Sequence, residues 1–295
     1  MRTFLYWVVR ITLRPFLAPW IPIPLQRLWG KLAALSVKGP PGVTDAPLQM
    51  GAIAARKLVP ADARPGHAIL YLHGGAYVIG GPGSHAKLAG HIGRAARRAV
   101  YFVDYRLAPE HPFPAALDDA LAAYRWLLAQ GHAPAQVTLA GDSAGGGLAL
   151  ALAMSIRDGK LPAPGALVLI SPWTDLTLGG ASHRSHARRD PMLRGSWLAA
   201  CAAHYAGARP LNEPLLSPAF GNLAGLPPML IQVGSEEILW SDSESLAQRA
   251  RAAGTAVTLK RHEGLWHDFQ VHAGLLPEAD HALAGIGAFV EATHA

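Results

Sequence analysis

The sequence is poor in cysteine, in charged residues and in long apolar runs. One cysteine, Cys201, occurs in 295 residues, which excludes an internal disulfide framework and a multi-cysteine metal cluster. Cys201 lies in an alanine-rich stretch that we interpret as helical, so we expect it to be a small core residue. Charged residues make up 16% of the chain and apolar residues 51%, a composition that argues against wholesale disorder.

Acidic residues are missing from the start of the chain. Six cations precede the first acid, Asp45, and they account for the whole net charge of +6: Arg2, Arg10, Arg14, Arg27, Lys31 and Lys38. The rest of the chain therefore sums to zero. A diffuse basic surface is absent, so we expect no nucleic-acid partner.

The basic start of the chain is also aromatic and apolar, with the run FLYWVV at residues 4–9. Arg10 and Arg14 cut this run short of the roughly 20 apolar residues that span a membrane. The run is also too short for a signal peptide and no small-residue cleavage site follows it, so we expect a cytoplasmic protein. Two interpretations stay open. The segment covers part of the domain as an amphipathic element, or it makes a peripheral contact with a membrane surface, to which cationic and aromatic residues are suited.

Short apolar runs alternate with helical patterns after about residue 43. Strands are predicted at 68–72, 99–104, 137–140, 166–170, 229–233 and 257–260, and helices at 85–98, 115–129, 144–157, 243–253 and 281–293. This alternation predicts an α/β protein with a mostly parallel sheet covered by helices on both faces. The stretch between Ser171 and Pro228 breaks the alternation, and we expect it to form a cap above the sheet.

The motif G-x-S-x-G, made of Gly141, Ser143 and Gly145, stands between a predicted strand and a predicted helix. This is the context of a nucleophile elbow, a sharp turn that exposes the serine hydroxyl. The helix N-terminus would favour negative charge developing there. The alternative, a phosphate-binding loop, needs a lysine after the glycines, and none is present. We therefore predict that Ser143 is a nucleophile.

Two adjacent glycines, Gly74 and Gly75, follow the predicted strand 68–72. Without side chains, their backbone N–H groups can face a ligand. Together with the N–H of Ala144, they would bind an oxyanion next to Ser143. The alternative is a flexible turn, but the position two strands before the serine favours an oxyanion hole.

The base and acid of an elbow serine come later in the chain. The last predicted strand leads into KRHEGLWHDF, which offers His262 and His267. We predict that His267 is the base, because it lies in a loop that can reach back over the sheet, whereas His262 abuts the strand. A zinc site is disfavoured because H-E-x-x-x-H is one residue longer than H-E-x-x-H.

Three carboxylates follow the preceding strand: Glu236, Glu237 and Asp242. We predict that Glu236 is the acid, because it is the first carboxylate after the strand end. Glu237 is then expected to point elsewhere, and Asp242 to cap the next helix or to lie in its first turn. The acid would hold the tautomer of the imidazole and stabilise its charged form.

The sequence resembles the hormone-sensitive-lipase family of α/β-hydrolases, in its bacterial carboxylesterase branch with a GDSAG motif. The resemblance covers about residues 69 to 270 and rests on YLHGGAYVIG, VDYRLAPEHPFPAALDDA, LAGDSAGGGLA, ISPWTDL, LPPMLIQVGSEEIL and EGLWHDF. It implies one α/β-hydrolase domain with an eight-stranded, mostly parallel sheet. It also implies a helical cap made of about residues 1–45 and 177–216.

The resemblance also implies a set of site residues: Ser143, Glu236, His267, Gly74, Gly75 and Ala144. Two departures from the family pattern stand out. Ala76 occupies the last position of the usual HGGG motif, and the acid is a glutamate where aspartate is more frequent. We further expect Arg106 and Glu110 to form a buried structural ion pair.

The function implied is a serine carboxylesterase that hydrolyses short- to medium-chain acyl esters through an acyl-enzyme, with no metal or organic cofactor. Six side chains are candidates for lining the substrate pocket: Trp173, Met192, Leu193, Trp197, Phe220 and Trp266. Two alternatives stay open, hydrolysis of a small lactone and a non-catalytic small-molecule receptor on the same fold. The sequence does not indicate the oligomeric state.

Overall fold

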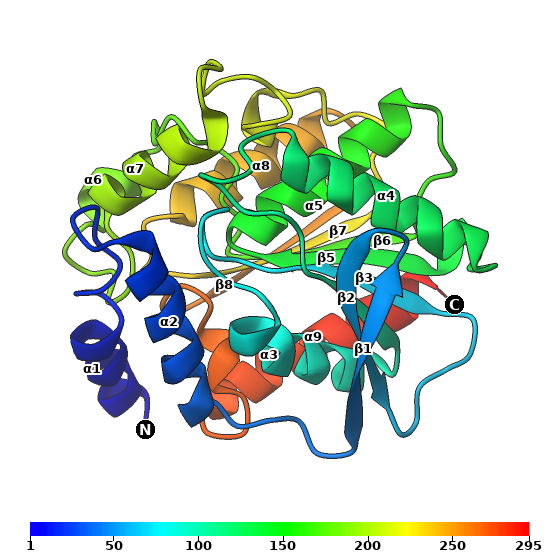
Figure 1. Ribbon diagram of the computed structural model, residues 1–295, viewed down its shortest axis with the longest axis horizontal. Helices are drawn as coiled ribbons and strands as arrows, with labels where there is room; N and C mark the ends of the chain where they lie inside the picture. The colour runs from blue at the N-terminus through cyan, green and yellow to red at the C-terminus, as the bar shows by residue number, and fades with distance from the viewer. Residues whose placement is uncertain (295) are drawn as a thin grey trace.

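An eight-stranded sheet forms the centre of the computed structural model, which describes residues 1–294 (Figure 1). The strands are β1 (Val43–Met50), β2 (Ile53–Pro60), β3 (Ala68–Leu72), β4 (Ala99–Val103), β5 (Val137–Asp142), β6 (Ala166–Ile170), β7 (Met229–Gly234) and β8 (Val257–His262). Their order across the sheet is β1-β2-β4-β3-β5-β6-β7-β8. β2 pairs antiparallel with β1 and β4, and every other pair is parallel, which confirms the predicted sheet.

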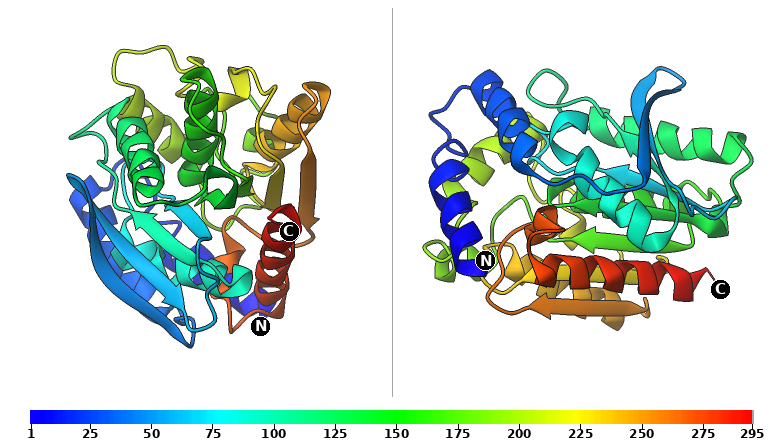
Figure 2. Two further views of the ribbon diagram at one scale, coloured as in Figure 1. Left: turned by 90° about the vertical axis from the view of Figure 1, so that its right-hand side faces the viewer. Right: turned by 90° about the horizontal axis from the view of Figure 1, so that it is seen from below.

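Helices cover both faces of the sheet. They are α1 (Arg2–Thr12), α2 (Ile23–Ala33), α3 (Pro82–Ala96), α4 (Ala115–Ala129), α5 (Ala144–Asp158), α6 (Ser182–Ser185), α7 (Gly195–Ala206), α8 (Trp240–Ala252) and α9 (Pro277–Thr293). α3 and α9 pack on one face, and α4, α5 and α8 on the other (Figure 2). β3, β5, β6 and β7 are buried along their whole length, as expected for parallel strands between two helical layers.

The sequence patterns did not indicate the antiparallel hairpin of β1 and β2. Most residues of β1 are exposed, and Pro47 lies within it. An edge strand of this kind carries no continuous apolar run, because only one end of it packs on the core. The predictions for β3 and β6, by contrast, coincide with the observed strands.

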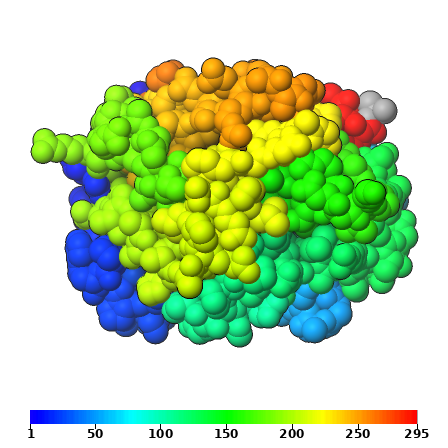
Figure 3. Space-filling model, turned by 90° about the horizontal axis from the view of Figure 1, so that it is seen from above, coloured from blue at the N-terminus to red at the C-terminus, as the bar shows by residue number. Residues whose placement is uncertain are grey.

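The two predicted cap segments lie side by side at one end of the molecule, where α1 and α2 meet α6 and α7 (Figure 1). Tyr6 Oη donates to the carbonyl of Arg189 at 2.8 Å, and Trp197 Nε1 donates to Gln26 Oε1 at 2.8 Å. In the space-filling view, the insertion after β6 adjoins the N-terminal residues (Figure 3). None of the helices in residues 1–294 combines the length and the apolar character needed to cross a membrane.

Candidate active site

Ser143 occupies the turn between β5 and α5 with φ 53° and ψ −121°, a backbone conformation that is costly for a residue with a side chain. The turn is possible because its neighbours lack side chains. A Cβ on Gly141 would overlap the carbonyl of Gly145, and a Cβ on Gly145 would overlap the carbonyl of Leu72. The Ser143 N–H donates to the carbonyl of Ile170 at 2.8 Å, which ties the turn to the end of β6.

The Ser143 side chain is fixed at this turn, and its Oγ stays accessible. The residue is 5% exposed, and its Oγ is not among the fully buried polar atoms that lack a partner. Within residues 1–294 no hydrogen bond engages this Oγ, and the hydroxyl lies at the N-terminus of α5. The geometry therefore leaves Oγ free to approach a ligand.

Gly74 and Gly75 follow β3, the strand that pairs with β5 next to the elbow. Gly75 has φ +110°, and a Cβ there would overlap the carbonyl of Ile79. A Cβ on Gly74 would overlap the carboxylate of Asp142. In the part of the chain that the structure describes, no protein acceptor engages the N–H groups of Gly74, Gly75 or Ala144. These three donors remain the predicted oxyanion hole.

Ala76 departs from the family's glycine at a position where glycine is physically favoured. Its φ is 53° and that of Tyr77 is 63°, so two consecutive residues adopt left-handed conformations. The Tyr77 ring stacks on Tyr205 of α7 with 3.7 Å between the ring centroids. This stacking holds the loop in place against its strained backbone.

The carboxylate that contacts His267 belongs to Glu237, so the prediction of Glu236 was wrong. Glu237 Oε2 lies 2.8 Å from His267 Nδ1, and both side chains are buried. Glu237 Oε1 accepts hydrogen bonds from Ser171 Oγ and from the N–H of Gly234. Glu236 instead pairs with Arg189 of the insertion at 2.6 Å. The Arg189 guanidinium lowers the pKa of Glu236.

The difference between the two glutamates comes from the backbone after β7. The Glu236 N–H donates to the carbonyl of Leu265 at 2.9 Å, and the side chain then points toward the cap. The N–H of Ile238 donates to Asp190 Oδ2 at 3.0 Å, which holds the other end of the turn. Glu237, between these two anchors, faces inward. The sequence contained both carboxylates in the run SEE but no signal for which of them faces the sheet edge.

Asp268, which sequence reasoning missed, lies on the other side of the imidazole. Its Oδ2 is 3.1 Å from His267 Nε2, the nitrogen that does not face Glu237. Its backbone has φ 53°, and its N–H points to Ser171 Oγ at 3.4 Å. Ser171 therefore contacts both Glu237 and the Asp268 backbone. The only sequence signal was the position of Asp268 directly after the predicted base.

The two carboxylates set the charge of the imidazole. Burial alone would lower the pKa of His267, but Asp268 and Glu237 outweigh it and the pKa lies well above its ordinary value. Burial also raises the pKa of Asp268, because the carboxylate is removed from water. The resting site therefore favours a charged imidazolium between two carboxyl groups.

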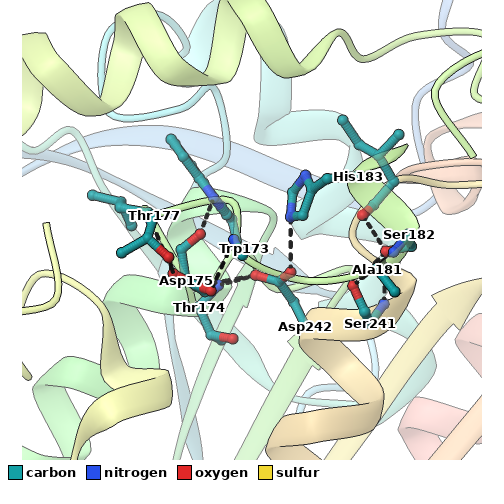
Figure 4. A network of polar contacts seen from close by, with 12 residues as sticks. Trp173, Thr174, Asp175, Thr177, Ala181, Ser182, His183, Ser241 and Asp242 are labelled. Atoms are coloured by element: carbon teal, nitrogen blue, oxygen red, sulfur yellow. Dashed lines mark hydrogen bonds and ion pairs between the residues drawn. The ribbon is translucent and has the colours of Figure 1, made fainter. Parts of the chain in front are cut away.

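A separate polar network holds the chain that follows Ser171 (Figure 4). Asp242 Oδ2 accepts the N–H groups of Thr174 and Asp175, each at 3.0 Å, and Oδ1 lies 3.1 Å from His183 Nε2. Burial raises the pKa of Asp242. The prediction that Asp242 lies in the first turn of a helix is confirmed. Its carboxylate also links α8 to the insertion.

The predicted ion pair between Arg106 and Glu110 is wrong. Arg106 Nη2 contacts Asp119 Oδ1 of α4 at 2.7 Å, and Glu110 contacts Arg27 of α2 at 2.7 Å. The Arg106 side chain is 48% exposed and that of Glu110 is 53% exposed. Neither partner belongs to the turn, since Asp119 follows it in α4 and Arg27 precedes it in α2, so local spacing carries no information about them.

The predicted pocket residues fall into three classes. Phe220 is 46% exposed and Met192 is partly buried, while four are core residues: Trp173, Leu193, Trp197 and Trp266. Trp266 packs with Leu5 and Val9 of α1. Their contact with a substrate stays a prediction. Cys201 is 2% exposed in α7, in agreement with its predicted place in the core.

Comparison with known proteins places this chain in a family. Residues 69–271 match the family described as alpha/beta hydrolase fold. A crystal structure of an esterase from the bacterial hormone-sensitive lipase family superposes with TM-score 0.95 at 37% identity, covering 100% of this chain and 98% of that one. The chain belongs to the α/β-hydrolases, in their bacterial hormone-sensitive-lipase branch.

Two further relatives carry names that bear on the chemistry of this hormone-sensitive-lipase branch. An acetyl-hydrolase from Streptomyces hygroscopicus is 48% identical over 225 residues, which are 76% of this chain and 75% of that protein. The crystal structure of the esterase EstE5 soaked with p-nitrophenyl butyrate is 38% identical with TM-score 0.94, and the match covers 99% of this chain and 98% of that one.

Proposed function

We propose that the protein is a serine carboxylesterase that hydrolyses short- to medium-chain acyl esters through an acyl-enzyme. One observation carries the proposal: a strained elbow serine stands at the same edge of the sheet as a buried histidine–glutamate pair. In this proposal Ser143 is the nucleophile, His267 the base and Glu237 the acid. The esterase and acetyl-hydrolase relatives support the ester-hydrolase class.

The steps follow from the positions of these groups. His267 Nε2 accepts the Ser143 proton while Oγ attacks the ester carbonyl, and Glu237 accepts a hydrogen bond from Nδ1–H. The N–H groups of Gly74, Gly75 and Ala144 receive the oxyanion, and loss of one such donor typically costs about 3 kcal/mol. The alcohol leaves with the proton from His267. Water, activated by the same nitrogen, then releases the acid.

Asp268 adds a condition to this mechanism. A base must be neutral before it accepts a proton, and the Asp268 carboxylate beside Nε2 favours the charged imidazolium. The same carboxylate stabilises the imidazolium once the serine proton has been transferred. We therefore expect activity to rise with pH as His267 loses its resting proton.

The acyl preference is supported by the names of the relatives and by the covered site. One relative is called an acetyl-hydrolase, and another was soaked with a butyrate ester. The two predicted cap segments, the N-terminal one and the insertion after β6, contact each other at one end of the sheet. A cap in this position would restrict long acyl chains. Short acyl groups should therefore react fastest.

A panel of p-nitrophenyl esters from acetate to palmitate tests the proposal, with Ser143→Ala as the control and a small lactone as an added substrate. We expect the highest kcat/KM on short esters and no activity above background in Ser143→Ala. Turnover that persists in Ser143→Ala would overturn the nucleophile. A maximum on palmitate would overturn the chain length, and absence of turnover on every substrate would favour a receptor.

A further inference from the structure

The large apolar side chains that the fold leaves exposed are gathered in one segment. Eleven such side chains are exposed in the described part of the chain, and nine of them lie in residues 1–35: Met1, Phe4, Trp7, Ile11, Trp20, Leu25, Leu28, Leu32 and Leu35. We call these nine residues the N-terminal apolar surface. Scattered exposed apolar residues are ordinary, whereas a concentration of this kind marks an interaction site.

The outward face of α1 carries exposed apolar side chains at helical spacing. Phe4, Trp7 and Ile11 are 65%, 53% and 68% exposed and follow each other at intervals of three and four residues. Leu5 and Val9 form the opposite stripe, which packs with Leu265 and Trp266. The helix is therefore docked by one apolar stripe and presents a second one to the outside.

α2 presents its apolar residues outward in the same way. Leu25, Leu28 and Leu32 are exposed on one face, and Gln26 is the residue of this helix that is buried. Polar contacts hold the helix to the body of the protein: Arg27 Nε donates to the carbonyl of Val78 at 2.9 Å, and Gln26 accepts from Trp197. The position of α2 thus does not depend on burying its leucines.

Positive charge predominates along this surface, although Glu110 neutralises Arg27 of α2. The first 44 residues contain no acid, and Arg2, Lys31 and Lys38 are exposed. The adjoining insertion adds Arg184 and Arg188, both exposed, and among its own acids Asp190 is buried and Glu213 pairs with Arg209. A partner of this surface must therefore combine an apolar interior with negative charge.

We propose that the N-terminal apolar surface binds the face of an anionic lipid bilayer. Amphipathic helices with tryptophan, phenylalanine and leucine on one side lie in the plane of such a membrane, with lysine and arginine reaching the phosphates. A second copy of this chain fits less well, because it would bring two unneutralised sets of cations together. This inference concerns binding and does not depend on the proposed hydrolysis.

The location of the surface connects it with the candidate active site. Leu265 and Trp266, which receive the inner stripe of α1, directly precede His267. The membrane would therefore contact the protein on the outside of the helix that supports the loop of the proposed base. An ester dissolved in the bilayer would be delivered to the capped end of the sheet.

Vesicle flotation of the full-length protein tests the proposal. The probes are phosphatidylcholine vesicles and vesicles of phosphatidylcholine mixed with phosphatidylglycerol in equal parts. We expect binding to the anionic vesicles, weakened by salt, and at least tenfold weaker binding to the neutral ones, since each cation near the surface contributes about 1 kcal/mol.

Two double variants divide the surface into its components. Trp7→Ser with Leu28→Ser removes apolar contact, and Lys31→Gln with Lys38→Gln removes charge; each should weaken anionic binding about tenfold. Leu275→Ser is the matched control, because Leu275 is 42% exposed outside this surface and should leave binding unchanged. Hydrolysis of soluble p-nitrophenyl acetate should be the same in all three proteins, which separates failure to bind from failure of the enzyme or of folding.

Three outcomes would overturn the proposal. The first is absence of flotation with either vesicle. The second is equal loss in the Leu275→Ser control. The third is light scattering that shows a dimer which Trp7→Ser with Leu28→Ser converts to a monomer while vesicles stay unbound, because the surface would then be an interface between two copies.

Discussion

α5, the helix that follows Ser143, buries most of its residues, whereas the N-terminal helices α1 and α2 leave many apolar residues exposed. α5 buries twelve of its fifteen residues, whereas α1 buries Leu5 and Val9, and α2 buries a single glutamine. α5 packs on the sheet beside α4 and begins directly after Ser143, so its packing holds the serine turn. The N-terminal pair instead leaves a second apolar face open. All residues of the candidate active site at the sheet edge come from this chain. The N-terminal apolar surface, by contrast, implies a partner outside it.

The largest expected effect distinguishes Glu237, which is buried at the sheet edge, from its partly buried neighbour Glu236. Glu237→Gln should lower kcat by about 10³–10⁴-fold, because His267 loses the charge that holds its tautomer and stabilises the imidazolium. Glu236→Gln, which removes a partner of Arg189 at the surface, should change kcat by less than about threefold. Steady-state kinetics on one short ester compares the two, and equal losses would contradict the assignment of Glu237.

Two glycine variants compare the helices directly. Gly145→Ala places a Cβ against the carbonyl of Leu72 and must displace the elbow, so we expect about 3 kcal/mol of destabilisation and about 100-fold lower kcat/KM. Gly30→Ala in α2 meets no atom within 4 Å, and should stabilise the protein by about 0.5–1 kcal/mol through helix propensity. Urea unfolding and the ester assay measure both. If Gly145→Ala changed neither the stability nor the activity, the elbow would not be tightly packed.

The two stripes of α1 should respond differently to truncation. Leu5→Ala removes a side chain packed beside Trp266 and should destabilise the protein by about 2 kcal/mol. Phe4→Ala on the outer stripe should change stability by less than about 0.5 kcal/mol. Thermal unfolding tests this contrast. A large loss in Phe4→Ala would show that the outer stripe contributes to the fold and is not reserved for a partner.

The smallest effect concerns the charge next to the base. Asp268→Asn removes one carboxylate that raises the pKa of His267, and that pKa should fall. The imidazole is then neutral at lower pH, so the acidic limb of the kcat/KM profile should move to lower pH. Glu237, whose carboxylate contacts His267 Nδ1 and also raises its pKa, stays in place and should sustain part of the shift. An unchanged limb would show that Asp268 does not control the protonation of the base.

Sequence reasoning succeeded where a local pattern is sufficient. β3 and β6 are short apolar runs bounded by polar or glycine residues, and both were predicted at their observed limits. The G-x-S-x-G motif indicated a strand–turn–helix elbow because only glycines allow the turn, and the structure has that turn at Ser143. Of the two candidate histidines, His267 is the one that contacts a carboxylate of the preceding loop, and its role as the base stays a prediction.

Sequence reasoning failed where the outcome depends on segments that are distant in the chain. The direction of Glu236 and Glu237 follows from anchors at Leu265 and Asp190, which no spacing within SEE reveals. The partners of Arg106 and Glu110 come from α4 and α2 for the same reason. The hairpin of β1 and β2 was missed because an exposed edge strand needs no apolar run.

The amino-acid sequence by itself determined the α/β architecture, the serine elbow and the basic, aromatic start of the chain. Each of these depends on periodicity, on glycines at fixed positions or on composition, and all three are local properties. The tertiary structure alone decided which glutamate meets His267, that Asp268 lies beside Nε2, and which side of α1 faces outward. Those outcomes depend on backbone hydrogen bonds and packing between segments that only the folded chain brings together.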